Sequence, residues 1–65
     1  MTTNVEEAWR LLKNRMEREG FSRGQIDVRR SAYISGVYAA SADLLMNGVS
    51  PTALSEAAAR IEAQR

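Results

Sequence analysis

An all-α fold of three helices is predicted by the hydrophobic periodicity of the chain, by its glycines and by its helix-capping sequences. Apolar residues recur at intervals of three and four in three segments, near residues 4–19, 23–47 and 51–63. No segment alternates apolar and polar residues with a period of two, so no strand is expected. The 65 residues are short enough to form a single helical domain, residues 1–65.

The first expected helix begins with the capping-box sequence Thr3-Asn4-Val5-Glu6, in which Thr3 would be the N-cap. Gly20 is expected to end this helix in the left-handed conformation, with Phe21 contacting the last turn. The residues expected to pack on the rest of the protein recur at helical spacing and are Val5, Trp9, Leu12 and Met16.

The second and third helices have equally clear boundary residues. Ser22 and Gln25 form another capping box, and Gly48 is expected to end the second helix. Ser50 followed by Pro51 then predicts the start of the third helix, with serine as N-cap and proline at the first helical position. The packing face of the third helix is expected to be Leu54, Ala58 and Ile61.

The middle helix is apolar or small on nearly every side. From Ser31 to Ala42 it carries no charged residue, and a helix that is apolar all round must be covered all round. A domain this small buries only about 60% of its unfolded surface, so two short flanking helices are too little to cover it. We therefore expect a long central helix that is completed by homo-oligomerisation, as a homodimer or a higher oligomer.

Gly36 indicates where the copies would meet. A glycine inside a helix costs about 1 kcal/mol relative to alanine, and the small ridge Ala32, Gly36, Ala40 would let another backbone approach closely. The glycine could equally make room for Trp9 within one chain. Asp43 either faces solvent or pairs with an arginine, within the chain or across the interface. The residues expected at the oligomer interface are Tyr33, Gly36, Val37, Ala40 and Leu44.

Positive charge is concentrated in residues 10–30, which carry a net +4 although the whole chain is only +1. One end of the molecule is therefore expected to be basic, although the same charges could form an ordinary solvated face. The arginines in the first two turns of the second helix are opposed by its dipole, so an acidic partner or a bound anion would stabilise them. The expected partner-binding residues are Arg23, Arg29, Arg30 and Tyr38.

Several classes of chemistry are excluded by composition. The chain has no histidine and no cysteine, which rules out Ser-His-Asp and Cys-His catalysis, disulfides and the usual zinc sites. Its glycines do not form a phosphate-binding loop. We expect no enzyme activity, no catalytic or metal-ligating residue and no cofactor. The apolar run of about 15 residues is shorter than the roughly 20 that span a bilayer, so we expect a cytoplasmic protein with no membrane contact.

The function expected from these features is that of a small helical protein-interaction module. It would bind itself and another protein, as an adaptor, inhibitor or regulator of a larger protein. Small modules of this kind are common among phage and mobile-element inhibitors of host systems. An interaction module is expected here because the chain lacks catalytic chemistry, is small and has an excess of apolar helix surface.

A DNA-binding regulator is the alternative. The string Gly48-Val49-Ser50-Pro51-Thr52-Ala53-Leu54-Ser55, followed by Ala57 to Glu62, resembles the turn and recognition helix of LysR-type regulators. The resemblance covers about 15 residues and implies a helix-turn-helix that binds nucleic acid. The chain departs from the pattern at Leu44, where a small residue would be usual, and in the length of the preceding helix. It also offers no arginine or lysine before Arg60 for base or phosphate contacts.

Overall fold

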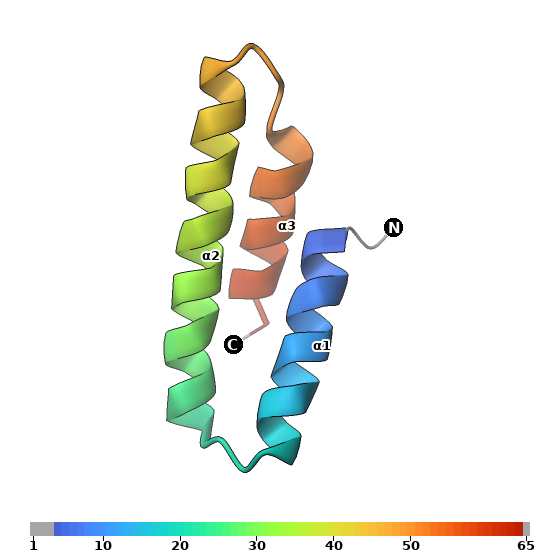
Figure 1. Ribbon diagram of the computed structural model, residues 1–65, viewed down its shortest axis with the longest axis vertical. Helices are drawn as coiled ribbons and strands as arrows, with labels where there is room; N and C mark the ends of the chain where they lie inside the picture. The colour runs from blue at the N-terminus through green and yellow to red at the C-terminus, as the bar shows by residue number, and fades with distance from the viewer. Residues whose placement is uncertain (1–3, 65) are drawn as a thin grey trace.

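The computed structural model describes residues 4–64, and within that range it contains three α-helices and no strand. Helix α1 spans Asn4–Arg18, α2 spans Arg23–Met46 and α3 spans Thr52–Glu62. Each boundary lies within one residue of its predicted position. The chain runs down α1, up α2 and down α3, so that α2 is antiparallel to both other helices (Figure 1).

The connection between α1 and α2 forms as the sequence predicts. Gly20 has a φ of +86°, and the amide of Phe21 donates to the carbonyl of Met16 at 3.0 Å, which closes a Schellman motif. Ser22 Oγ then accepts from the Gln25 amide at 3.2 Å, while Gln25 Oε1 accepts from the Ser22 amide at 2.8 Å. The predicted N-cap of the first helix, Thr3, lies outside the described residues.

The connection between α2 and α3 matches the prediction only in part. Gly48 has a φ of +78°, and the Val49 amide donates to the Leu44 carbonyl at 2.9 Å, so the second Schellman motif is confirmed. The prediction that Ser50 caps α3 is wrong. Pro51 is the N-cap, and Ser50 Oγ lies 3.0 Å from the hydroxyl of Thr52 instead of accepting from a helix amide.

The core lies where the three helices meet, since each of them contacts both of the others. Trp9 and Ile61 are its largest fully buried side chains. The other buried hydrophobic residues are Met16, Ile26, Ile34, Val37, Ala57 and Ala58. Val5 and Leu54 pack against this cluster at its edge. The placement of Leu12 in the packing face was wrong, because Leu12 is 39% exposed at the opening between α1 and α2.

Helix α1 reaches along only part of α2, as Figure 1 shows. At 1.5 Å per residue, the 15 residues of α1 extend for about 22 Å and the 24 residues of α2 for about 36 Å. Beyond the start of α1, α3 lies beside α2 (Figure 1). Leu45, Met46 and Val49, at this end of the molecule, are large apolar side chains that are exposed.

Candidate functional site

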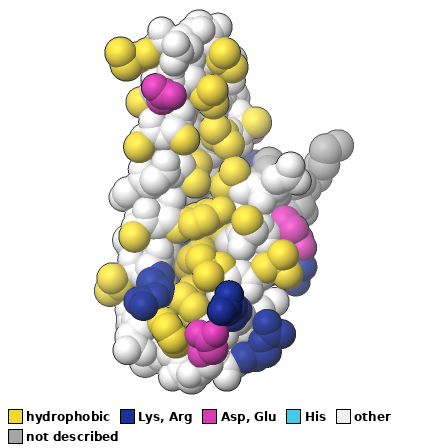
Figure 2. Space-filling view, in the orientation of Figure 1, with side chains coloured by type: hydrophobic (Ala, Val, Ile, Leu, Met, Phe, Trp, Pro, Cys, Tyr) yellow, Lys and Arg dark blue, Asp and Glu magenta, His cyan; other side chains and the backbone are white. Residues whose placement is uncertain are grey.

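An apolar groove runs along one face of the molecule, beside α2. Figure 2 shows hydrophobic side chains in a band between α2 and the other two helices. The upper part of the groove has a volume of about 290 Å³ and is lined by Val5, Ala32, Tyr33, Gly36, Val37, Ala40 and Leu54. The lower part has a volume of about 510 Å³ and is lined by Leu12, Arg15, Met16, Glu19, Phe21, Arg29, Ala32 and Tyr33. Ala32 and Tyr33 line both parts, so the two parts adjoin at these residues.

Gly36 lies in the wall of this groove and touches nothing. A Cβ placed on Gly36 would have no heavy atom within 4 Å outside its own stretch of helix. The explanation that this glycine makes room for Trp9 is therefore wrong. Its neighbours on the same side of α2, Ala32 and Ala40, are also exposed. Packing within one chain thus gives no reason for a glycine at this position.

Tyr33 joins the two parts of the groove and is held in place on both sides. Its hydroxyl donates to the carbonyl oxygen of Val5 at 2.9 Å, and its ring lies 5.4 Å from that of Trp9. Partial burial raises the pKa of the Tyr33 phenol above its ordinary value. The half-buried ring therefore forms a rigid wall of the groove.

The structure brings most of the predicted interface residues together. Tyr33, Gly36, Val37 and Ala40 all line the upper part of the groove. Val37 is buried within the single chain, so it forms the base of the groove. Leu44 is half-buried one turn further along α2 and does not line the groove.

Two charged residues on the same side of α2 lack an ion pair. Arg29 precedes Gly36 by seven residues and Asp43 follows it by seven, which places both on the Gly36 side of the helix. The Arg29 guanidinium lies 4.6 Å from the centre of the Phe21 ring. Neither Arg29 nor Asp43 forms a salt bridge with any residue from 4 to 64.

The predicted partner-binding residues do not form one surface. Arg29 lines the groove, whereas Tyr38 is exposed elsewhere on α2. Arg30 is only 3% exposed and pairs with Asp27, with its guanidinium 5.5 Å from the centre of the Trp9 ring. Its burial could have been found from its spacing, since it falls four residues after Ile26 on the buried side of α2.

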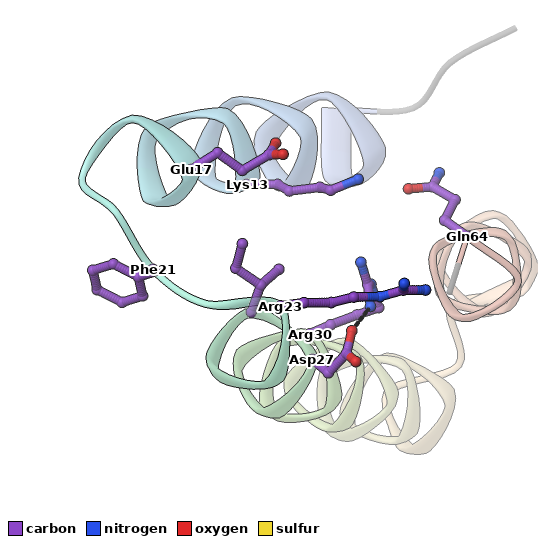
Figure 3. Close-up of a pocket in the computed structure, with 8 residues that line it drawn as sticks. Lys13, Glu17, Phe21, Arg23, Asp27, Arg30 and Gln64 are labelled. Atoms are coloured by element: carbon purple, nitrogen blue, oxygen red, sulfur yellow. Dashed lines mark hydrogen bonds and ion pairs between the residues drawn. The ribbon is translucent and has the colours of Figure 1, made fainter.

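A second hollow, here called the basic cavity, lies between α1, the start of α2 and the end of α3. It has a volume of about 480 Å³ and is lined by Lys13, Glu17, Phe21, Arg23, Ile26, Asp27, Arg30 and Gln64. Figure 3 shows Lys13 entering it from α1 and Arg23 from α2, with Gln64 on the far side. The sequence did not place Lys13 or Gln64 here, because the pattern within one helix says nothing about which residues of another lie opposite.

The arrangement of the helices, the placement of the acidic side chains and the hydropathy of the helices are relevant to binding of nucleic acid, metal ions and membranes. In Figure 1, α3 runs beside α2 in the opposite direction, whereas the two helices of a helix-turn-helix cross at roughly 90–120°. The described part of the chain has no group of three or more His, Cys, Asp or Glu side chains able to hold a metal ion. None of its helices has the length and hydropathy needed to cross a membrane.

The chain matches no protein-family model, no curated protein and no solved structure.

Proposed function

We propose that this chain is a non-enzymatic protein-interaction module that works as a homodimer, with the apolar groove as the contact between two copies. The observation that carries the proposal is the open position at Gly36. A glycine in the middle of a helix destabilises it by about 1 kcal/mol relative to alanine, and nothing within the chain requires it here. Close approach of a second α2 would offset that cost.

A second copy is the occupant favoured by the charges around the groove. The wall from Ala32 to Ala40 is uncharged, so two copies can approach without repulsion. In a dimer with two-fold symmetry the same patch meets itself. If the axis passes near Gly36 and the two α2 helices are antiparallel, Ala32 faces Ala40 of the other copy.

The same symmetry places the unpaired charges opposite one another. Arg29 and Asp43 are equally distant from Gly36 in sequence, on either side of it. An antiparallel pairing centred on Gly36 therefore sets Arg29 of each copy against Asp43 of the other. Both ends of the contact would gain an ion pair that is absent within one chain, and the pairing would select the antiparallel arrangement.

In this role the dimer would act as an adaptor, inhibitor or regulator of a larger protein. Tyr38 and Leu45 are exposed and lie on the side of α2 opposite Gly36. They would remain accessible to a larger protein after the groove is covered. Paired apolar surfaces of this kind are typical of interaction proteins.

The proposal is tested by measuring the solution mass with light scattering over a wide concentration range. We expect a dimer for the natural chain and a monomer for Gly36→Leu, because the leucine side chain holds the two helices apart. Ala42→Leu is the matched control, since it adds a leucine to an exposed position on another side of α2. It should stay dimeric, and circular dichroism should show equal helix content in all three proteins.

Two outcomes would contradict the proposal. A natural chain that stays monomeric at high concentration has no contact of this kind. A Gly36→Leu variant that dimerises as well as Ala42→Leu shows that the groove is not the contact. The DNA-binding alternative is tested on the same samples by titrating duplex DNA at several salt concentrations, where binding should weaken steeply with salt.

A further inference from the structure

The basic cavity contains a buried cation that the protein does not fully stabilise. Arg30 is 3% exposed, and its Nε has no hydrogen-bond partner among the described residues. One terminal nitrogen of the guanidinium pairs with Asp27, and the Trp9 ring lies beneath it. A buried charge is costly unless its hydrogen-bonding groups are satisfied. One carboxylate and one aromatic face leave this guanidinium short of partners.

Other cations reach the same space from different directions. Lys13 comes from α1 and Arg23 from the first turn of α2, and in Figure 3 both extend into the gap between the helices. The amide of Gln64 faces them from beyond the end of α3. Two carboxylates also line the cavity, Glu17 and Asp27, so the lining has a formal charge of +1. Asp27 is already engaged by Arg30.

The start of α2, where Arg23 lies, adds to the positive potential in the basic cavity. The first turn of α2 contains no acidic residue, although the positive end of the helix dipole normally favours one there. Arg23 lies in that turn, and Arg30 lies two turns further on. The positive end of the α2 dipole therefore adds to the charge of Arg23.

We propose that the basic cavity binds the phosphate group of a small phosphate monoester. Lys13 approaches from α1, and Arg23 and Arg30 approach from the same side of α2, so cations flank the cavity on two sides, which suits a dianion with several oxygens better than a singly charged carboxylate with two. A volume of about 480 Å³ falls in the range of ligand pockets, roughly 300–1,000 Å³. It leaves room for a small organic group beside the phosphate. Among the residues that line the cavity, Phe21 also lines the lower part of the apolar groove, and the others lie outside the groove.

Isothermal titration calorimetry with inorganic phosphate and with glycerol 3-phosphate, at constant ionic strength against chloride, tests this site. Lys13→Gln and Arg23→Gln should each weaken binding by about tenfold or more, since each removes a charge-assisted hydrogen bond to the phosphate. Arg18→Gln is the matched control: it removes the same charge from an exposed residue that does not line the cavity, and it should change affinity by less than about twofold. Glu17→Gln should strengthen binding.

A second readout comes from the Arg30 guanidinium signal in NMR spectra of the natural chain, since Arg30 lines the cavity. It should shift on adding phosphate and stay in place with chloride, and this readout holds even if variants of Arg30 fail to fold. Tighter binding of glycerol 3-phosphate than of phosphate supports a monoester, whereas equal affinity supports free phosphate as the ligand. The proposal is overturned if phosphate binds no better than chloride. It is equally overturned if Lys13→Gln and Arg23→Gln behave like Arg18→Gln.

Discussion

At the scale of single residues, the side chains that sequence analysis misplaced lie at the edges of the apolar stripes. Leu12 belongs to the helical stripe of α1 but points to the opening of the groove, whereas Arg30 interrupts the stripe of α2 and is buried. Periodicity predicts which side of a helix faces inward. It does not predict where a neighbouring helix stops covering that side, and although the spacing puts Arg30 on the buried side of α2, it does not identify Asp27 and Trp9 as the groups beside its guanidinium. Sequence analysis therefore predicted most of the core residues correctly and was less accurate for residues at the edge of the core.

Tyr33 gives a prediction at this scale. Tyr33→Phe should lower the free energy of unfolding by about 1 kcal/mol, because it removes the hydrogen bond to the Val5 carbonyl. Tyr38→Phe, at an exposed position, is the control and should have little effect. The measurement is urea unfolding at neutral pH. A Tyr33→Phe variant as stable as Tyr38→Phe would show that this hydrogen bond contributes nothing net.

The same tyrosine predicts a dependence on alkaline pH. Burial raises the pKa of Tyr33 in the folded chain, so the folded state holds the phenol proton more tightly than the unfolded state. This contribution to stability is fully present below the unfolded pKa of about 10 and is lost as the pH rises through the folded pKa. The measurement is the free energy of unfolding from pH 8 upwards. The loss should appear in the single variant Tyr38→Phe and be absent from the double variant that combines Tyr33→Phe with Tyr38→Phe.

At the scale of the helices, local sequence was sufficient for nearly every boundary. The two Schellman motifs and the Ser22 capping box depend on a few adjacent residues, and all three are confirmed. Ser50 was misassigned because its hydroxyl engages Thr52 instead of a helix amide, and α3 begins after Pro51, which makes no side-chain capping hydrogen bond. The arrangement of the helices also defines the groove and the basic cavity, which no single helix contains.

Replacing a glycine by alanine should change the free energy of unfolding in opposite directions at two positions. Gly36→Ala should raise the free energy of unfolding of the monomer by up to about 1 kcal/mol, because its Cβ meets open space in a regular helix. Gly20→Ala should lower it by about 1 kcal/mol, because an alanine is strained at a φ of +86°. Thermal unfolding at low protein concentration measures both. If Gly36→Ala also weakens the dimer while stabilising the monomer, the glycine serves the contact between copies.

At the scale of the whole molecule, the single chain is elongated and has slightly more accessible surface than a compact protein of its mass. The chain extends over 41 × 23 × 17 Å, and α1 leaves one end of α2 uncovered on one side (Figure 1). Its accessible surface is 4544 Å², against roughly 4,100 Å² for a compact protein of this mass. The sequence predicted that the uncharged stretch of α2 would keep an uncovered apolar face, and the expectation that a second copy covers it remains a prediction.

The antiparallel arrangement of that dimer is testable by exchanging its charges. Arg29→Glu sets two carboxylates together at both ends of the contact, and Asp43→Arg sets two guanidinium groups there, so each change should weaken the dimer by about threefold to tenfold. Arg29→Glu with Asp43→Arg restores opposite charges and should recover most of the affinity. Sedimentation equilibrium at low salt measures the dissociation constants, and Arg18→Glu serves as the control for net charge. A double variant that is weaker than both single variants would mean that Arg29 and Asp43 never meet, because only a shared contact can make the second substitution repair the first.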